Sequence, residues 1–141
     1  MIVYLDSSVV LRRVLGQPHA LTEWPRIQTA VASALAEVEC LRTIDRLRLR
    51  GLLTDAEVAR HRSTIAEVID RVELVLPSSR VLRRAAEPFP TSLGTLDAIH
   101  LATALLWRDE RNADLVLATH DEELALAARA CRLRVVGAPR G

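Results

Sequence analysis

The sequence contains no lysine, because all 19 of its basic residues are arginine. The lack of lysine excludes enzymes that form a Schiff base with a substrate carbonyl, and it excludes nucleotide sites built on a P-loop lysine. Phosphotransfer receivers and haloacid-dehalogenase-type phosphatases also need a lysine and are excluded with them. Any catalysis must therefore depend on other groups, chiefly the 18 acidic residues and the four histidines.

Aromatic residues and cysteines are also scarce. One Phe, one Tyr and two Trp offer few stacking platforms for bases, which argues against the RNA-binding modules that rely on stacking. Cys40 and Cys131 stand alone rather than in CxxC pairs, which argues against a zinc cluster or a disulfide framework. We expect both to be buried thiols in a reducing compartment.

The charge and hydropathy patterns exclude two further classes. The net charge is only +1, so composition alone does not indicate a nucleic-acid binder. Charged residues interrupt every apolar run before it reaches the length of a membrane span. The first ten residues are too short and wrongly flanked for a signal peptide, so we expect a cytoplasmic protein with no membrane association.

Apolar strand-like segments alternate with amphipathic helical segments along the chain. The expected strands are residues 2–5, 29–33, 72–77, 114–118 and 133–137. The expected helices are residues 7–15, 19–26, 34–50, 54–71, 78–87, 95–110 and 119–130. This alternation predicts an α/β fold with a central parallel sheet of about five strands covered by helices on both faces. A length of 141 residues fits a single domain, 1–141.

Polar residues mark the expected helix starts. Thr54–Glu57 and Thr119–Glu122 have the capping-box pattern, in which a threonine is followed three residues later by a glutamate. Ser78 or Ser79, and then Thr95, are expected to cap two other helices.

Acidic residues follow the expected strands. Asp6 ends the first strand, Asp121 follows the fourth, and Asp97 lies in the first turn of its helix. The carboxyl ends of parallel strands face one crevice, so we expect these side chains to converge there. Carboxylates without a neighbouring lysine repel one another, and a divalent cation would relieve that repulsion. Their hard oxygens favour Mg²⁺ or Mn²⁺.

Simpler interpretations exist for several of these acids. An aspartate in the first turn of a helix also stabilises the helix dipole. On the helix over 34–50, Glu37 and Glu39 point about 200° apart, so only one can face the crevice. Periodicity alone favours Glu39 only weakly.

Four segments together resemble the PIN-domain ribonucleases, specifically the VapC-type toxins of bacterial toxin–antitoxin pairs. They are YLDSSVVLRRVL, ASALAEVECLRTIDRL, TLDAIHLATAL and LATHDEELALAARACRLRVV, in the same order and spacing. TLDAIHLATAL is the most specific, and the resemblance covers essentially the whole chain. It implies a PIN-like three-layer α/β/α fold and a metal-dependent endoribonuclease that hydrolyses RNA phosphodiester bonds.

The resemblance also assigns residues and partners. Asp6, Glu39, Asp97 and Asp121 correspond to the catalytic and metal-binding acids of the family, which selects Glu39 over Glu37. Asp6 and Asp97 are the expected core ligands of Mg²⁺ or Mn²⁺. The expected partners are RNA, a VapB-type antitoxin and a second copy of the chain. Gly94 stands where many relatives carry an arginine, so their substrate preference is not carried over.

Neighbouring residues suggest supporting roles. Ser8 and Thr119 are expected to orient carboxylates by hydrogen bonding. Arg42, Arg46 and Arg50 recur every four residues on the Glu39 helix, and Arg12 and Arg13 follow Asp6. We expect Arg42, Arg46 and Arg12 to contact RNA, although a solvated helix face with local ion pairs explains these residues equally well.

Two histidines lie close to these acids in the sequence. His100 is three residues after Asp97, and we expect it to be a buried, hydrogen-bonded histidine rather than a ligand. His120, beside Asp121, is expected to be peripheral. The alternative to a nuclease is a non-catalytic PIN-like scaffold that binds RNA or a protein partner.

Overall fold

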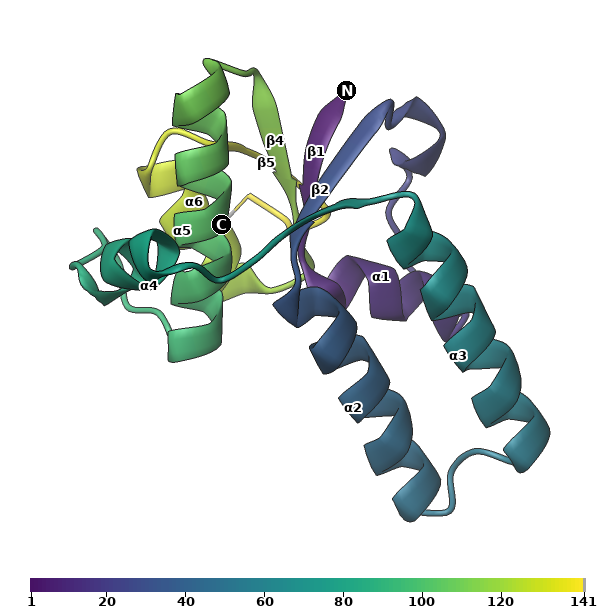
Figure 1. Cartoon of the computed structure of the whole chain (residues 1–141). Coiled ribbons are helices and arrows are strands. Elements are labelled where there is room, and N and C mark those ends of the chain that lie inside the picture. Colours follow the sequence, from purple (N-terminus) through teal and green to yellow (C-terminus); the bar gives the residue numbers. More distant parts are fainter. Residues whose placement is uncertain (141) are drawn as a thin grey trace.

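A computed structural model describes residues 1–140, and Gly141 of the expected domain lies outside the described residues. Its centre is a five-stranded parallel sheet in the order β3-β2-β1-β4-β5 (Figure 1). The strands are β1 (Ile2–Leu5), β2 (Thr29–Ser33), β3 (Glu73–Val75), β4 (Leu115–Ala118) and β5 (Arg134–Val136). All five expected strands are confirmed within two residues at either end.

Helices cover both faces of this sheet (Figure 1). They are α1 (Ser7–Val14), α2 (Leu35–Leu49), α3 (Asp55–Asp70), α4 (Ser79–Ala86), α5 (Thr95–Arg111) and α6 (Glu122–Ala130). α1, α2 and α3 pack on one face, α5 and α6 pack on the other, and α4 packs against α5. The expected three-layer α/β/α architecture is therefore confirmed.

The two faces of β1 supply two separate cores. Val3 and Leu5 pack with α1, α2 and α3, whereas Tyr4 packs with α5 and α6. This alternation follows the two-residue repeat of a β-strand. β1 has β2 on one side and β4 on the other, and its residues Val3, Tyr4 and Leu5 are almost completely buried.

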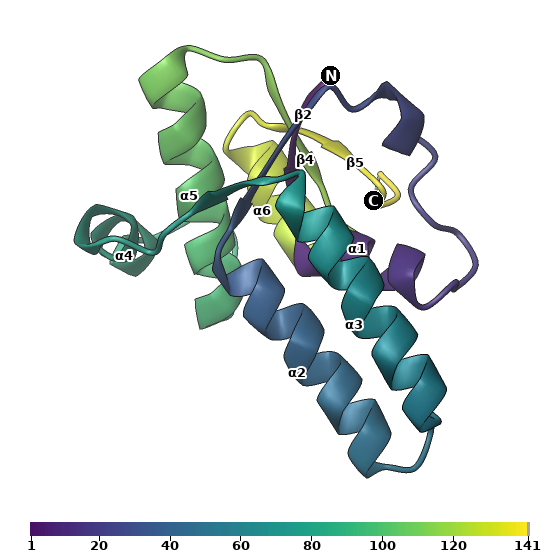
Figure 2. The same ribbon diagram turned by 45° about the vertical axis from the view of Figure 1, so that its right-hand side comes forward.

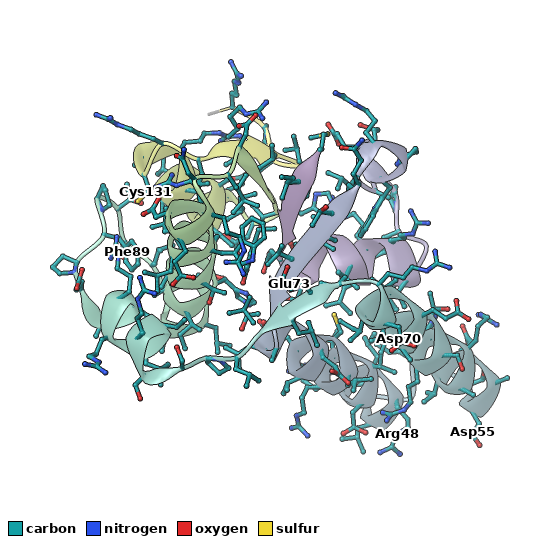
Figure 3. All side chains as sticks on the ribbon, turned by 45° about the horizontal axis from the view of Figure 1, so that its top comes forward. Arg48, Asp55, Asp70, Glu73, Phe89 and Cys131 are labelled. Atoms are coloured by element: carbon teal, nitrogen blue, oxygen red, sulfur yellow. The ribbon has the colours of Figure 1, made fainter. Side chains whose placement is uncertain are left out.

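α2 and α3 form a hairpin that extends away from the sheet (Figure 2). The capping box predicted at Thr54 is present, because its hydroxyl accepts the N–H of Glu57 and the Glu57 carboxylate accepts the N–H of Thr54. Leu49 and Leu52, at the far end of the hairpin, are 69% and 63% exposed. Charged side chains also cover this end, with Arg48 and Asp55 among them (Figure 3).

The predicted helix over 19–26 is wrong. Only Trp24–Arg26 forms a single 3-10 turn. Pro25 has no backbone N–H to donate, and His19 has a φ of +62°, which no right-handed helix accommodates.

Two predicted helix caps are also corrected. Gly94, not Thr95, precedes α5, and Thr95 is its first residue. α6 is capped by Asp121 instead of Thr119, because the Asp121 carboxylate accepts the N–H of Leu124. Short carboxylates and hydroxyls are comparably good caps, so the sequence pattern did not separate the two.

The remaining expectations on burial are met in part. Cys40 is buried as expected, whereas Cys131 is half-buried, because it lies just beyond the end of α6. Both thiols are free. Within residues 1–140, no helix combines the length and the hydropathy needed to cross a membrane.

Gly137, just after β5, is the glycine most constrained by its surroundings. Its φ is +92°, and a Cβ there would lie 2.7 Å from the backbone oxygen of Thr119. Gly51 also has a positive φ, +70°, but a Cβ at that position would meet nothing within 4 Å. Substitutions at Gly51 and Gly137 therefore separate the cost of a positive φ from the cost of a steric clash.

We expect Gly51→Ala to lower the free energy of unfolding by about 1 kcal/mol through strain alone. Gly137→Ala should lower it further, to a total of roughly 2–4 kcal/mol, because the methyl group also displaces the Thr119 backbone. Urea denaturation of both variants measures the difference. Equal losses would show that the Thr119 segment moves aside freely.

Candidate active site

The four predicted acids converge at the carboxyl edge of the sheet. Asp6 follows β1, Asp121 follows β4, and Glu39 lies in the second turn of α2 after β2. β2, β1 and β4 are adjacent strands, so their ends place these three acids next to one another. Asp97, in the first turn of α5, approaches from the helical layer and feels the charges of the other three.

Asp6 is fixed by two hydroxyl groups. Ser8 Oγ and Thr119 Oγ1 both donate to Asp6 Oδ2, at 2.6 and 2.8 Å. Each hydroxyl also accepts a backbone N–H, that of His120 for Ser8 and that of Asp121 for Thr119. Ser8 and Thr119 thus lie where the sequence predicted, and they leave Asp6 Oδ1 facing the other acids.

Two of the other acids also have one oxygen held by the protein. Asp121 Oδ1 accepts the N–H of Leu124 at 2.8 Å, which ties it to the start of α6. Glu39 Oε1 lies 2.5 Å from His100 Nε2. Asp6, Glu39 and Asp121 therefore each use one oxygen in the fold and keep a second oxygen for a ligand.

The structure distinguishes Glu39 from Glu37. Glu39 is the residue of α2 that reaches His100 on α5, and its side chain is 24% exposed. The neighbouring Val38 is 55% exposed, as expected for the side of α2 away from the sheet. Glu39 therefore lies with the other acids, as the resemblance implied.

The concentration of negative charge changes the pKa of Asp97. Burial and then the charges of Asp121 and Asp6 raise the pKa of Asp97 from 3.8 to about 6, although His100 partly opposes them. A carboxyl group that resists ionisation in this way marks a place where a cation would be stabilised.

His100 is completely buried between Tyr4 and Glu39. Its Nδ1 lies 2.8 Å from Tyr4 Oη, its Nε2 contacts Glu39 at 2.5 Å, and the same Nε2 is 3.9 Å from Asp6 Oδ1. Burial alone lowers the pKa of His100, but the Glu39 hydrogen bond and the Asp6 charge outweigh it and raise the pKa overall.

The expected buried, hydrogen-bonded His100 is confirmed, but its contacts with Glu39 and Tyr4 were not predicted. The sequence contained one indication of the Tyr4 contact. Tyr4 is the only aromatic residue in an otherwise aliphatic strand, and it stands two residues before Asp6, on the same side of the chain. The His120 Nδ1–H donates to Gly137 O at 2.7 Å, which keeps His120 at the margin of the site.

Cys40 is adjacent to Glu39 but does not contribute a nucleophile. Burial first, and then the charges of Glu39 and Asp6, raise the pKa of Cys40 to about 12. The thiol therefore stays protonated, and it is neither a nucleophile nor a metal ligand at neutral pH.

The acidic side chains of the site suit a divalent cation that keeps some of its own waters. Among residues 1–140, no group of three or more His, Cys, Asp or Glu side chains is arranged to hold a metal ion directly. Mg²⁺, however, commonly keeps several waters and binds through only one or two carboxylates. The free oxygens of Asp6, Glu39 and Asp121, together with Asp97, suit this kind of partly hydrated site.

Arg42 and Arg46 lie exposed on α2, whereas Arg12 is partly buried on α1. Arg42 approaches Asp45 at 4.0 Å, and Arg46 donates to Thr43 Oγ1 at 3.0 Å. Arg12 donates to the backbone oxygen of His19 at 3.4 Å. These local contacts agree with a solvated helix face, and they leave the guanidinium groups available to phosphate.

Two surface hollows lie away from the acids. One is formed by α1, α3 and the 3-10 turn, where the Arg13 guanidinium lies 4.8 Å from the centre of the Trp24 ring. The other lies between α6 and β5. Neither is lined by any of the four acids.

Asp97→Asn is expected to stabilise the metal-free protein at neutral pH. The folded protein binds the Asp97 proton more tightly than the unfolded chain, so ionisation destabilises the fold increasingly from pH 3.8 upwards and fully above about 6. The side chain is only half-buried and solvent screens its charge, so the variant should gain on the order of 1–3 kcal/mol at pH 7.5. The gain should shrink as the pH falls through 6 and vanish near 3.8.

Urea denaturation in EDTA at pH 7.5 and pH 4 measures this difference. Asp109→Asn, on an exposed part of the same helix, is the matched control and should change stability by less than about 1 kcal/mol. A stability gain for Asp97→Asn that does not depend on pH would contradict the charge-repulsion explanation.

Both the sequence and the fold are similar to those of known proteins. The sequence matches the PIN domain family over residues 3–130. It is 34% identical to ribonuclease VapC46 and 33% identical to ribonuclease VapC35, both from Mycobacterium tuberculosis, over 95% of each chain. The fold resembles a toxin–antitoxin complex chain from Klebsiella pneumoniae, with a TM-score of 0.66 at 15% identity over 98% and 96% of the two chains. It also resembles a chain of VapBC2 from Rickettsia felis bound to a promoter DNA fragment, with a TM-score of 0.63 at 16% identity over 96% and 97%.

Proposed function

The chain belongs to the PIN domain family, and on that premise we propose that it is a metal-dependent endoribonuclease and the toxin of a toxin–antitoxin pair. The observation that carries the proposal is the convergence of Asp6, Glu39, Asp97 and Asp121 in a chain whose relatives are ribonucleases over nearly their whole length. Residues 1–141 act as one PIN domain in this proposal.

The proposed ligands follow from the free oxygens of the site. Asp6 and Asp97 bind Mg²⁺ or Mn²⁺, and Glu39 and Asp121 complete the site directly or through water. When bound, the cation supplies charge neutralisation at the scissile phosphate and a lowered pKa for a bound water.

The protein's own residues then position the reaction. Ser8 and Thr119 hold Asp6 so that Oδ1 points into the site, and the start of α6 does the same for Asp121. Glu39 or Asp121 accepts the proton of the attacking water as general base, since each keeps one oxygen free. Arginines on α1 and α2 hold the RNA backbone, namely the partly buried Arg12 and the exposed Arg42 and Arg46.

The proposed partners extend from the same premise. A VapB-type antitoxin and a second copy of the chain are the protein partners, in line with the toxin–antitoxin complexes that share the fold. The exposed Leu49 and Leu52 at the end of the α2–α3 hairpin offer apolar surface to a protein partner. We also propose a cytoplasmic location, which an RNA substrate and two free thiols support.

RNA cleavage by the purified protein is expected to require Mg²⁺ or Mn²⁺ and to stop in EDTA. Asp6→Asn and Glu39→Gln should lower the cleavage rate by at least about 100-fold, because each loses charge where the cation and the phosphate meet. Gel analysis of structured tRNA, rRNA and mRNA substrates measures the rate.

Glu37→Gln is the matched control for Glu39→Gln, since it makes the same change on the same helix away from His100, and it should cleave at the wild-type rate. A protein that binds no metal and cleaves no substrate would instead favour the non-catalytic RNA- or partner-binding scaffold.

Arg46→Glu is expected to weaken RNA binding and to flatten its dependence on salt. One lost phosphate contact lowers the slope of log K against log salt by about 0.7 for a single strand. Filter binding with catalytically inactive Asp6→Asn protein, at several salt concentrations, measures the slope. Arg26→Glu, at the opposite edge of the sheet, should leave it unchanged, and an equal effect of both variants would assign the binding to overall charge.

A further inference from the structure

A chain of hydrogen bonds links the backbone of β2 to Glu39. The Ser33 N–H donates to Tyr4 Oη at 3.1 Å, Tyr4 Oη lies 2.8 Å from His100 Nδ1, and His100 Nε2 lies 2.5 Å from Glu39 Oε1. Tyr4, Ser33 and His100 are each completely buried. The chain therefore crosses β2, β1, α5 and α2 before it reaches the acid site.

The direction of the protons in this chain follows from the groups at its ends. The Glu39 carboxylate only accepts, so His100 Nε2 must carry a hydrogen. With a hydrogen on Nε2, neutral His100 leaves Nδ1 as an acceptor. The Tyr4 oxygen then accepts the Ser33 N–H and donates its own hydrogen to Nδ1.

This arrangement controls a side chain that would otherwise be free to turn. Glu39 is 24% exposed and has three side-chain torsions, so fixing its side chain costs rotamer entropy. His100 has the opposite character, because it is fully buried and held on its far side by Tyr4. His100 is therefore a rigid donor that holds the more mobile Glu39 carboxylate.

The same nitrogen also lies beside a second acid. His100 Nε2 is 3.9 Å from Asp6 Oδ1, the oxygen that Ser8 and Thr119 leave free. His100 thus lies between Asp6, at the end of β1, and Glu39, on α2 after β2.

We propose that His100, oriented by Tyr4, is a positioning residue that holds Glu39 Oε1 and so presents Glu39 Oε2 to the metal and water of the site. The inference rests on the proposed function for its catalytic consequence. The hydrogen bond itself exists without metal or RNA, so part of the test is independent of that function.

The first test uses the imidazole ¹⁵N spectrum of the metal-free protein. His100 should show a hydrogen-bonded Nε2–H, and Glu39→Gln should shift its Nε2 signal while Glu37→Gln leaves it unchanged. Tyr4→Phe should shift the Nδ1 signal. A His100 spectrum that is the same in wild type and Glu39→Gln would overturn the proposal, whatever the protein's activity.

The second test compares variants in Mn²⁺ affinity and in single-turnover RNA cleavage. His100→Leu should weaken Mn²⁺ binding or slow cleavage by about 10- to 100-fold, the range found for residues that orient metal ligands. His100→Gln, whose amide N–H replaces Nε2–H, should recover to within a few-fold of wild type. His61→Leu removes another buried histidine, on α3, and should change neither quantity.

A double-mutant cycle separates positioning from general support of the fold. If His100 acts through Glu39, then Glu39→Gln/His100→Leu should bind Mn²⁺ as Glu39→Gln does. A further loss in the double variant would overturn the proposal, and so would wild-type Mn²⁺ affinity and cleavage in folded His100→Leu. Wild-type protein that shows the Nε2 shift but cuts no RNA would contradict the proposed function and leave the Glu39 positioning intact.

Discussion

Repulsion among carboxylates is the constraint around which one edge of this molecule is organised. The four acids are brought together by the ends of β1 and β4, the second turn of α2 and the first turn of α5, and burial together with their repulsion raises the pKa of Asp97. The surrounding donors are arranged to tolerate it. Hydroxyl groups, a helix N-terminus and an imidazole each hold one oxygen of one acid, so the remaining oxygens face a common space.

The fold supplies these donors because β1 lies at the centre of the sheet. With neighbours on both sides, the strand is rigid, and its alternation directs Tyr4 towards α5 while Val3 and Leu5 anchor the opposite core. Asp6, which follows this strand, therefore has a fixed position. The neighbouring β4 places Thr119 beside it through the hydrogen bond from the Asp6 N–H to the Ala118 oxygen. Core packing and the proposed chemistry therefore depend on the same strand.

Much of this arrangement was readable in the sequence, and the rest was missed for identifiable reasons. Strands and acids follow a local pattern, since an apolar run that ends in a carboxylate is visible within six residues. The His100–Glu39 contact joins residues 61 positions apart, and no local period encodes it. The choice of Asp121 over Thr119 as helix cap depended on backbone angles, and the failed helix over 19–26 depended on the positive φ of His19. The roles assigned to the four acids stay predictions until variants are measured.

The order of the strands also has a consequence for the timing of synthesis. β1 is made first, yet one of its two partners, β4, is residues 115–118, and the last of the four acids is Asp121. At 5–20 residues per second, a ribosome needs on the order of ten seconds to reach that point. Until then the central strand lacks a neighbour and the acid set is incomplete. The proposed toxin is therefore inert throughout most of its own translation, and a partner protein made alongside it has that interval in which to be ready.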